Sequence, residues 1–238
     1  MVISHKYKYL YVALPLTGST SISNELCELY GGQRILKKHS FYHTFLKAAS
    51  DEEKKYFVFS GIRNPLDTIV TQYFRLKSNH KEHFTTPRNW KRNGGWVSGS
   101  QLRKFHIVQE THADFPTFFK KFYRIPFVDW STLAHKNFDF IIRFENLQTD
   151  FTRVLSILNI EQKHPLPLIN NTAGRSKEFW TYYTPEIRPL ARHIVGPFMK
   201  RWHYEFPDEW GKSTVSWGSQ LEFQAVNLMK KFKWRYWG

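Results

Sequence analysis

The stretch YKYLYVALPLTGSTSISNELCELY, from Tyr7 to Tyr30, decides the fold. Its first part, Tyr7 to Leu14, is a continuous aromatic and β-branched run, which is typical of a buried parallel strand. The glycine pair at positions 31 and 32, directly after the quoted stretch, is a stop signal for a helix. Before that pair, apolar residues recur at helical spacing at Ile22, Leu26 and Leu29. The order predicts a strand, a tight loop and a helix.

Two later stretches repeat this order. KYFVFSGI, from Lys55 to Ile62, predicts a strand. Asn64 is a good N-cap and Pro65 a good first residue for the helix that follows. FDFIIRF, from Phe138 to Phe144, predicts a further strand, and the apolar spacing from Glu145 to Leu158 predicts a further helix.

Alternating strands and helices predict the α/β class, with three α/β/α layers in a single domain and a central, mostly parallel sheet. Arg34 to Leu36 is a candidate for the second strand. The polar, glycine-rich stretch from Lys77 to Ser100 predicts a long mobile loop or lid. We expect the domain to span residues 1–212. Residues 213–238 are expected to form a basic, aromatic helical tail packed on the same domain.

The net charge points to an anionic partner. The chain has 35 basic and 20 acidic residues among 238, which gives a formal charge of +15. Nucleic acid, an acidic membrane surface, a glycan and a phosphorylated nucleotide all satisfy that charge, so motifs must decide among them.

Cysteine usage and hydropathy restrict the setting. Cys27 is the only cysteine, which excludes an intramolecular disulfide and a multi-cysteine zinc site. The apolar run from Tyr9 to Leu14 is too short for a signal-peptide core, and no run of about 18 apolar residues predicts a membrane span. We therefore expect a cytoplasmic protein with no stable membrane insertion.

The loop PLTGSTS, from Pro15 to Ser21, connects the first strand to its helix. Backbone N–H groups of such a loop, together with the positive end of the helix dipole, favour an anion. The GxxxxGK[ST] pattern of a Walker A loop is missing, which argues against an NTPase.

PLTGSTS resembles the 5′-phosphosulfate loop of PAPS-dependent sulfotransferases, whose usual form is P-K-x-G-[ST]-[ST]. IRNPLDTIVTQYFR, from Ile62 to Arg75, is similar to the segment of that family that holds the 3′-phosphate. Within that family, the sequence most resembles short bacterial or carbohydrate-type members. The resemblance implies PAPS as donor, PAP as product, a P-loop-like fold and no metal. It assigns loop contacts to the nucleotide at Thr17, Gly18, Ser19, Thr20 and Ser21.

The resemblance also implies contacts at the other end of the nucleotide. Arg63 and Thr71 take the positions of the family's Arg and Ser on the 3′-phosphate, and Arg175 and Lys177 those of its late basic contacts. FDFIIRFENL resembles the stretch that carries the family's R-x-E-x-L signature. We expect Arg143 and Glu145 of that signature to be a buried structural charge pair.

One residue departs from the family pattern. Leu16 stands where the family usually has the loop Lys, which balances charge on the oxygen between phosphorus and sulfur. Candidates to replace it are backbone donors, the Thr20 hydroxyl, Lys6, Lys8 or a cation on the acceptor side.

The acceptor must lose a proton, so a neutral His or a carboxylate is expected nearby. His39, in a K-H-S setting similar to the family's acceptor-side His, is the first candidate for the catalytic base, and His43 is the second. The acceptor is expected to be a small molecule or glycan with a hydroxyl or amine. The aromatic run FWTYY, Phe179 to Tyr183, suits either stacking on an acceptor ring or core packing.

Three alternatives stay open at this point. The chain fits a nucleotide-binding but catalytically weakened relative, because of Leu16. It fits a basic nucleic-acid-binding protein by charge, although no helix-turn-helix, RNP-like or zinc-finger spacing occurs. A small-molecule kinase would need a loop Lys and acidic residues for magnesium, and neither is evident. The oligomeric state is not predicted.

Overall fold

The computed structural model describes residues 1–128, 138–167, 174–212 and 214–237. The chain divides into two compact units. The first comprises Met1–Asn64, Val128–Asn171 and Asn227–Gly238. The second comprises Pro65–Phe127 and Thr172–Val226. Each is described by itself below.

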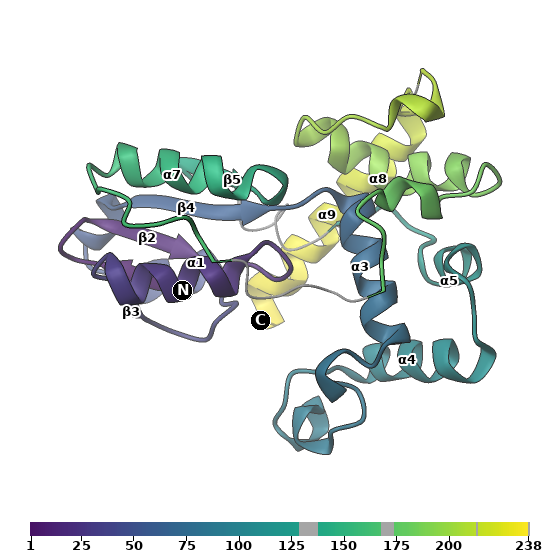
Figure 1. The fold of residues 1–238 in the computed structure, drawn as a ribbon, viewed down its shortest axis with the longest axis horizontal. Helices are drawn as coiled ribbons and strands as arrows, with labels where there is room; N and C mark the ends of the chain where they lie inside the picture. Colours follow the sequence, from purple (N-terminus) through teal and green to yellow (C-terminus); the bar gives the residue numbers. More distant parts are fainter. Residues whose placement is uncertain (129–137, 168–173, 213, 238) are drawn as a thin grey trace. The chain divides into compact units, whose positions relative to one another are not determined.

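The first unit is built on one sheet (Figure 1). Among the described residues the sheet has five strands, β1 Val2–Ser4, β2 Tyr9–Val12, β3 Gln33–Arg34, β4 Phe57–Ile62 and β5 Phe140–Arg143. Their order is β3-β1-β2-β4-β5. β1 runs antiparallel to both neighbours, whereas β2, β4 and β5 pair in parallel. All of these strands except β1 therefore run in one direction, and the predicted mostly parallel sheet is confirmed.

The first predicted strand is shorter than its sequence suggests. β2 begins at Tyr9, because Lys8 has a left-handed φ of 52° and closes a turn with the preceding strand β1. Three residues are too few for β1 to show a hydrophobic alternation, so this strand was not predicted. β3 ends at Arg34, whereas the candidate strand was expected to run to Leu36.

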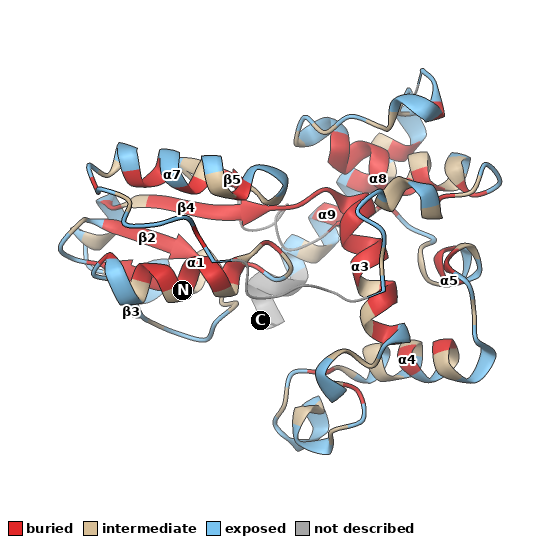
Figure 2. Cartoon of the chain, in the orientation of Figure 1, coloured by how far each residue is buried: buried red, intermediate tan, exposed pale blue. Residues whose placement is uncertain are grey.

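Helices cover both faces of this sheet. Tyr9 and Tyr11 of β2 pack in one apolar cluster with residues of α1 (Ser19–Leu29) and α7 (Leu147–Ile157). Leu10 and Val12, which alternate with them, pack in a second cluster with Phe45 of α2 (Tyr42–Ala48). Because neighbouring side chains of a strand point to opposite faces, the two clusters lie on the two sides of the sheet. The predicted α/β/α layers are confirmed, and Figure 2 shows β2 and all of β4 after its first residue in red.

The second unit is helical. Its longer helices are α3 Pro65–Lys77, α4 Gly99–Thr111, α5 Phe115–Phe122 and α8 Arg188–Arg201, and it contains the first part of α9 Trp217–Trp237. The stretch predicted as a long loop contains three short 3₁₀ helices, His80–Glu82, Pro87–Asn89 and Lys91–Asn93.

Aromatic packing holds the second unit together. Tyr183 is fully buried, lies 4.8 Å from Phe115 between ring centroids, and donates its hydroxyl to the Leu66 carbonyl at 3.0 Å. Burial raises the pKa of Tyr183 well above its usual value, so this hydroxyl keeps its proton and remains a donor. Of the two uses that FWTYY suits, core packing is the one that Tyr183 shows.

The predicted tail is a long helix. α9 begins at Trp217, and Ser219 donates its hydroxyl to the His193 carbonyl of α8 at 2.5 Å. Ser213 and Gly238, the ends of the predicted tail, lie outside the described residues. The boundary at residue 212 stays a prediction. Among the described residues, no helix is both long enough and apolar enough to span a bilayer.

The buried face of α7 gives a test of the first unit. Leu155 is fully buried in the cluster against the sheet, whereas Ile157 on the same helix is 46% exposed. We expect Leu155→Ala to lower the free energy of unfolding by about 2–5 kcal/mol and Ile157→Ala by less than about 1 kcal/mol. Urea unfolding of both variants measures the difference. Equal losses would show that α7 packs through another face.

Candidate active site

The loop after β2 has a bent backbone. Leu16 and Gly18 both have left-handed φ angles, 65° and 74°. Thr17 between them is buried and donates its hydroxyl to the Leu14 carbonyl at 3.0 Å. The Thr17 hydroxyl therefore holds the loop closed, and the anion contact implied for Thr17 is left to its backbone N–H.

Gly18 has no room for a side chain. A Cβ at this position would lie 2.9 Å from Cδ2 of Leu147, and the left-handed φ would strain any other residue. Leu147 is the first residue of α7, so the glycine lets α7 pack directly on the loop.

The helix α1 starts immediately after this turn. Within the described part of the chain no side chain caps its N-terminus, and the first turn carries no acidic residue. Ser19 and Ser21 are buried and Thr20 is half-buried. Uncapped N–H groups and the positive end of the helix dipole make this end of α1 suitable for an anion.

Arg63, at the end of β4, holds the loop from the other side. It is buried, its Nη1 donates to the Leu16 carbonyl at 3.2 Å, and its guanidinium carbon lies 4.0 Å from the centroid of the Phe144 ring. The structure therefore brings Arg63 together with the loop from Pro15 to Ser21.

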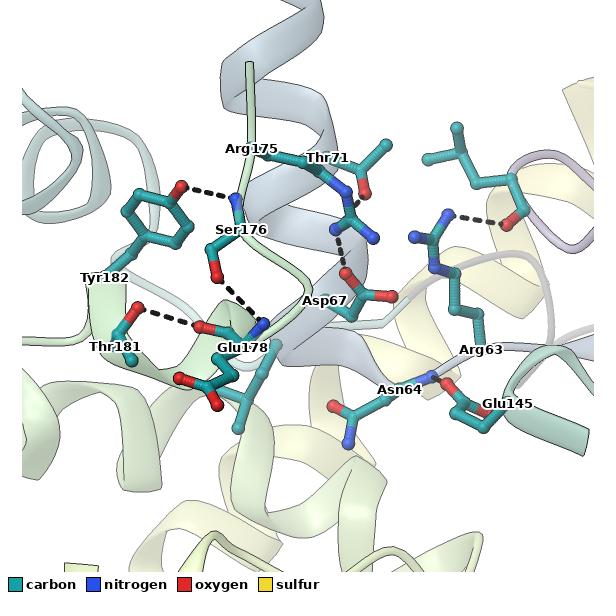
Figure 3. A network of polar contacts seen from close by, with 12 residues as sticks. Arg63, Asn64, Asp67, Thr71, Glu145, Arg175, Ser176, Glu178, Thr181 and Tyr182 are labelled. Carbon is teal, nitrogen blue, oxygen red and sulfur yellow. Dashed lines mark hydrogen bonds and ion pairs between the residues drawn. The ribbon is translucent and has the colours of Figure 1, made fainter. Parts of the chain in front are cut away.

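A carboxylate orders the backbone next to Arg63. Glu145 Oε1 accepts a hydrogen bond from the backbone N–H of Asn64 at 2.7 Å (Figure 3). The backbone N–H of Arg143 donates to Asp150 at 2.7 Å. Glu145 is an exposed residue, so the expectation of a buried charge pair is wrong for it. Its bond to the Asn64 backbone orders the chain just after strand β4.

In the second unit, Thr71 and Arg175 meet. Arg175 forms an ion pair with Asp67 and donates through Nη1 to Thr71 Oγ1 at 3.0 Å (Figure 3). Asp67 and Thr71 are both buried and lie one turn apart on α3. The sequence did not single out Asp67, although its spacing from Thr71 was a usable signal. Lys177 is exposed, two residues beyond Arg175.

His39 is positioned by Ala13, the residue that follows β2. Its Nδ1 lies 2.8 Å from the Ala13 carbonyl, which can only accept, so Nδ1 carries the proton. Burial lowers the pKa of His39 below its usual 6.5, although the Ala13 bond acts in the opposite direction. The ring is therefore neutral near pH 7, and its Nε2 has the lone pair that a base needs.

His43 lies on α2 in a different setting. Its ring stacks on Phe41 with the centroids 5.6 Å apart, and burial lowers its pKa as well. A lowered pKa therefore does not distinguish the two histidines. The backbone bond that orients His39 does, because it fixes the tautomer.

The proposed replacements for the loop Lys have other contacts. Lys8 forms an ion pair with Glu52 at 3.6 Å, and the Lys6 ammonium lies 4.9 Å from the Tyr7 ring centroid. A lysine that does reach the loop is Lys38, whose Nζ donates to Thr20 Oγ1 at 2.9 Å. Sequence reasoning named an acceptor-side cation only as a class.

A family model described as "Sulfotransferase family" matches residues 1–196, which is more than half of the chain. The comparison with curated proteins and that with solved structures each find no significant match. The matched region contains the loop, Arg63, His39 and the Arg175 contacts. The chain belongs to the sulfotransferase family, whose general chemistry is the transfer of a sulfuryl group.

Proposed function

We propose that the protein transfers a sulfuryl group from PAPS to a hydroxyl or amine of a small-molecule or glycan acceptor and releases PAP. The observation that carries the proposal is the loop from Pro15 to Ser21. It ends in an uncapped helix N-terminus and contacts one cation at each side, Arg63 at Leu16 and Lys38 at Thr20. Such a loop suits a phosphosulfate.

The reaction requires that the sulfuryl group be held in position and that the negative charge on the leaving oxygen be stabilised. The bond between sulfur and the bridging oxygen breaks, and its electron pair stays on the 5′-phosphate of PAP. A new bond forms between sulfur and the acceptor oxygen or nitrogen, whose proton passes to a base. As in phosphoryl transfer, the expected transition state is loose, so positioning and positive charge supply most of the catalysis.

At the phosphosulfate end we assign backbone N–H contacts to Thr17, Gly18, Ser19, Thr20 and Ser21. The Thr17 side chain is excluded from this role, because its hydroxyl donates to Leu14. Thr20 is half-buried, and its oxygen already accepts from Lys38, so its own O–H can donate to a ligand oxygen.

At the other end we follow the family resemblance, which gives the 3′-phosphate to Arg63 in the first unit and to Thr71, Arg175 and Lys177 in the second. Two of these support the assignment by their geometry, since Arg175 and Thr71 already meet through a hydrogen bond of 3.0 Å. Asp67 pairs with Arg175 and orients its guanidinium. A phosphate at this place would share Arg175 with Asp67.

We assign His39 as the base. Its protonated Nδ1 is held by the Ala13 carbonyl, at the start of the same loop, so Nε2 is the nitrogen that takes the acceptor proton. His43 remains the second candidate.

A catalytically weakened relative that still binds the nucleotide is the second candidate function. Leu16 favours it, because an apolar residue at that position supplies no charge to the leaving oxygen. Radiolabelled PAPS offered with a panel of phenols, amines and oligosaccharides tests the main proposal. Label must pass to an acceptor, and the reaction must persist in EDTA. Nucleotide binding without any transfer or cleavage would favour the weakened relative.

The isosteric variant Thr71→Val tests the 3′-phosphate assignment. Loss of one hydroxyl contact to phosphate should weaken PAP binding by roughly tenfold, because such a bond contributes about 1.4 kcal/mol. Affinity for AMP, which lacks the 3′-phosphate, should not change. Isothermal titration calorimetry with both nucleotides measures this.

Arg175→Gln should show the same selectivity with a larger loss of about 10- to 100-fold, since Arg175 carries charge. Arg63→Ala should weaken both nucleotides, because Arg63 also anchors the Leu16 carbonyl. Equal loss of PAP and AMP affinity in Thr71→Val would remove Thr71 from the 3′-phosphate site.

The variant His39→Asn tests the base. Asn Nδ2 can still donate to the Ala13 carbonyl, but no group replaces the lone pair of Nε2. Turnover should fall by about 10²- to 10⁴-fold with little change in the unfolding midpoint. In the native protein, turnover should be constant near neutral pH and fall only below pH 6.5, because the neutral form is active and burial lowers the pKa.

The control is His43→Asn, which removes the alternative base. Steady-state rates of both variants across pH 5–8 separate the two histidines. Should His43→Asn lose turnover while His39→Asn keeps its acid limb, the roles would be exchanged.

A further inference from the structure

Leu16 supplies no positive charge to the leaving oxygen of the donor. When the bond to sulfur breaks, negative charge builds on the oxygen that stays with the 5′-phosphate. A fixed positive group near that oxygen lowers the barrier, since it interacts more strongly with the transition state than with the ground state. The leucine side chain cannot do this.

Lys38 brings a charge to the loop from another segment. It lies between β3 and α2, 18 residues beyond Thr20, and its Nζ donates to Thr20 Oγ1 at 2.9 Å. The bond ends in the first turn of α1, where the helix dipole is also positive.

The bond fixes the direction of the Thr20 hydroxyl. An ammonium only donates, so Thr20 Oγ1 is the acceptor and its own hydrogen points elsewhere. An O–H that accepts from a cation is polarised and becomes a stronger donor. Lys38 can therefore act on a loop-bound anion through Thr20 as well as by its field.

Open space adjoins the contact between Lys38 and Thr20. Thr20 and Lys38 both line a cavity of about 150 Å³ in the first unit, together with Arg34. Their hydrogen bond thus borders open space and is not enclosed in the core.

We propose that Lys38, acting on the loop through Thr20, takes the electrostatic role that Leu16 cannot fill and stabilises the charge that develops on the leaving oxygen of the donor. The inference rests on the proposed function. The electron pair of the broken bond stays on that oxygen, and no proton moves to Lys38.

A neighbouring effect agrees with this placement. After burial and the opposing Ala13 bond, the charges of Lys38 and of the N-terminal ammonium also lower the pKa of His39. One ammonium thereby favours the neutral base and the charged leaving group together. Removing it should raise the pKa of His39 and move the acid limb of the rate profile to higher pH.

Lys38→Met, Lys38→Arg and the control Lys37→Met test the proposal. Lys37 is the neighbouring lysine and is exposed, as Lys38 is, so the two residues match in charge and exposure. The readouts are cleavage of PAPS with water as acceptor, which needs no identified substrate, and calorimetric binding of PAP.

For Lys38→Met we expect a roughly 10- to 100-fold lower kcat. The KM for PAPS should change by less than about threefold, and PAP, whose 5′-phosphate carries the full charge, should bind about tenfold more weakly. Lys38→Arg should recover part of the loss, and Lys37→Met should match the native protein.

Two double variants distinguish the effect of Lys38 through the Thr20 hydroxyl from a general effect on folding. Lys38→Met should cost less in a Thr20→Val background, because the path through the hydroxyl is already gone. Leu16→Lys should restore at least part of the rate lost in Lys38→Met, since it returns a cation to the loop.

The inference fails if Lys38→Met and Lys37→Met cleave PAPS equally fast, or if Leu16→Lys gives no recovery in the Lys38→Met background. Failure of the proposed function looks different. In that case the native protein itself does not cleave PAPS, whether or not it binds PAP.

Discussion

The turn at Gly18 is the constraint on which the site depends. With a left-handed φ of 74° and no Cβ, it allows Leu147 of α7 to lie where a side chain would otherwise be. A second small residue works with it, because a Cβ on Gly61 of β4 would lie 2.9 Å from Thr17 Oγ1. The loop is thus held between β4 and α7 by two positions that exclude side chains. Its backbone N–H groups are fixed before any ligand arrives, which limits the entropy lost on binding.

Polar contacts also stabilise the loop from Pro15 to Ser21. Thr17 closes the loop on Leu14, and Arg63 holds the Leu16 carbonyl while stacking on Phe144. A buried arginine is costly unless it is paired and hydrogen-bonded. In the first unit a carbonyl and an aromatic face offset part of that cost, and a phosphate would add the opposite charge. The same residue therefore stabilises the loop and, in the proposed function, would favour the anion.

Local sequence patterns predicted the α/β fold, but they could not predict contacts between segments that are distant in the sequence. The strand, loop and helix from Tyr9 to Leu29 could be predicted because hydrophobic spacing and the glycine are local signals. The bond from Lys38 to Thr20 could not, since it depends on where the segment after β3 places one flexible side chain. The pairing of Arg175 with Asp67 spans 108 residues and carries no periodicity. Motif resemblance supplied Arg63 and Thr71, but it could not supply Asp67.

The position of Lys38 has a consequence for how donor and acceptor chemistry are linked. A lysine within the loop would stabilise the leaving oxygen regardless of the acceptor side. Lys38 is adjacent in the chain to His39, which is tied to the Ala13 carbonyl, so one short segment carries both the cation for the leaving group and the candidate base. A displacement of that segment would weaken both effects together. In the proposed reaction, sulfuryl transfer would then depend on this segment being docked on the loop, which would couple activation of the acceptor to stabilisation of PAP as it leaves.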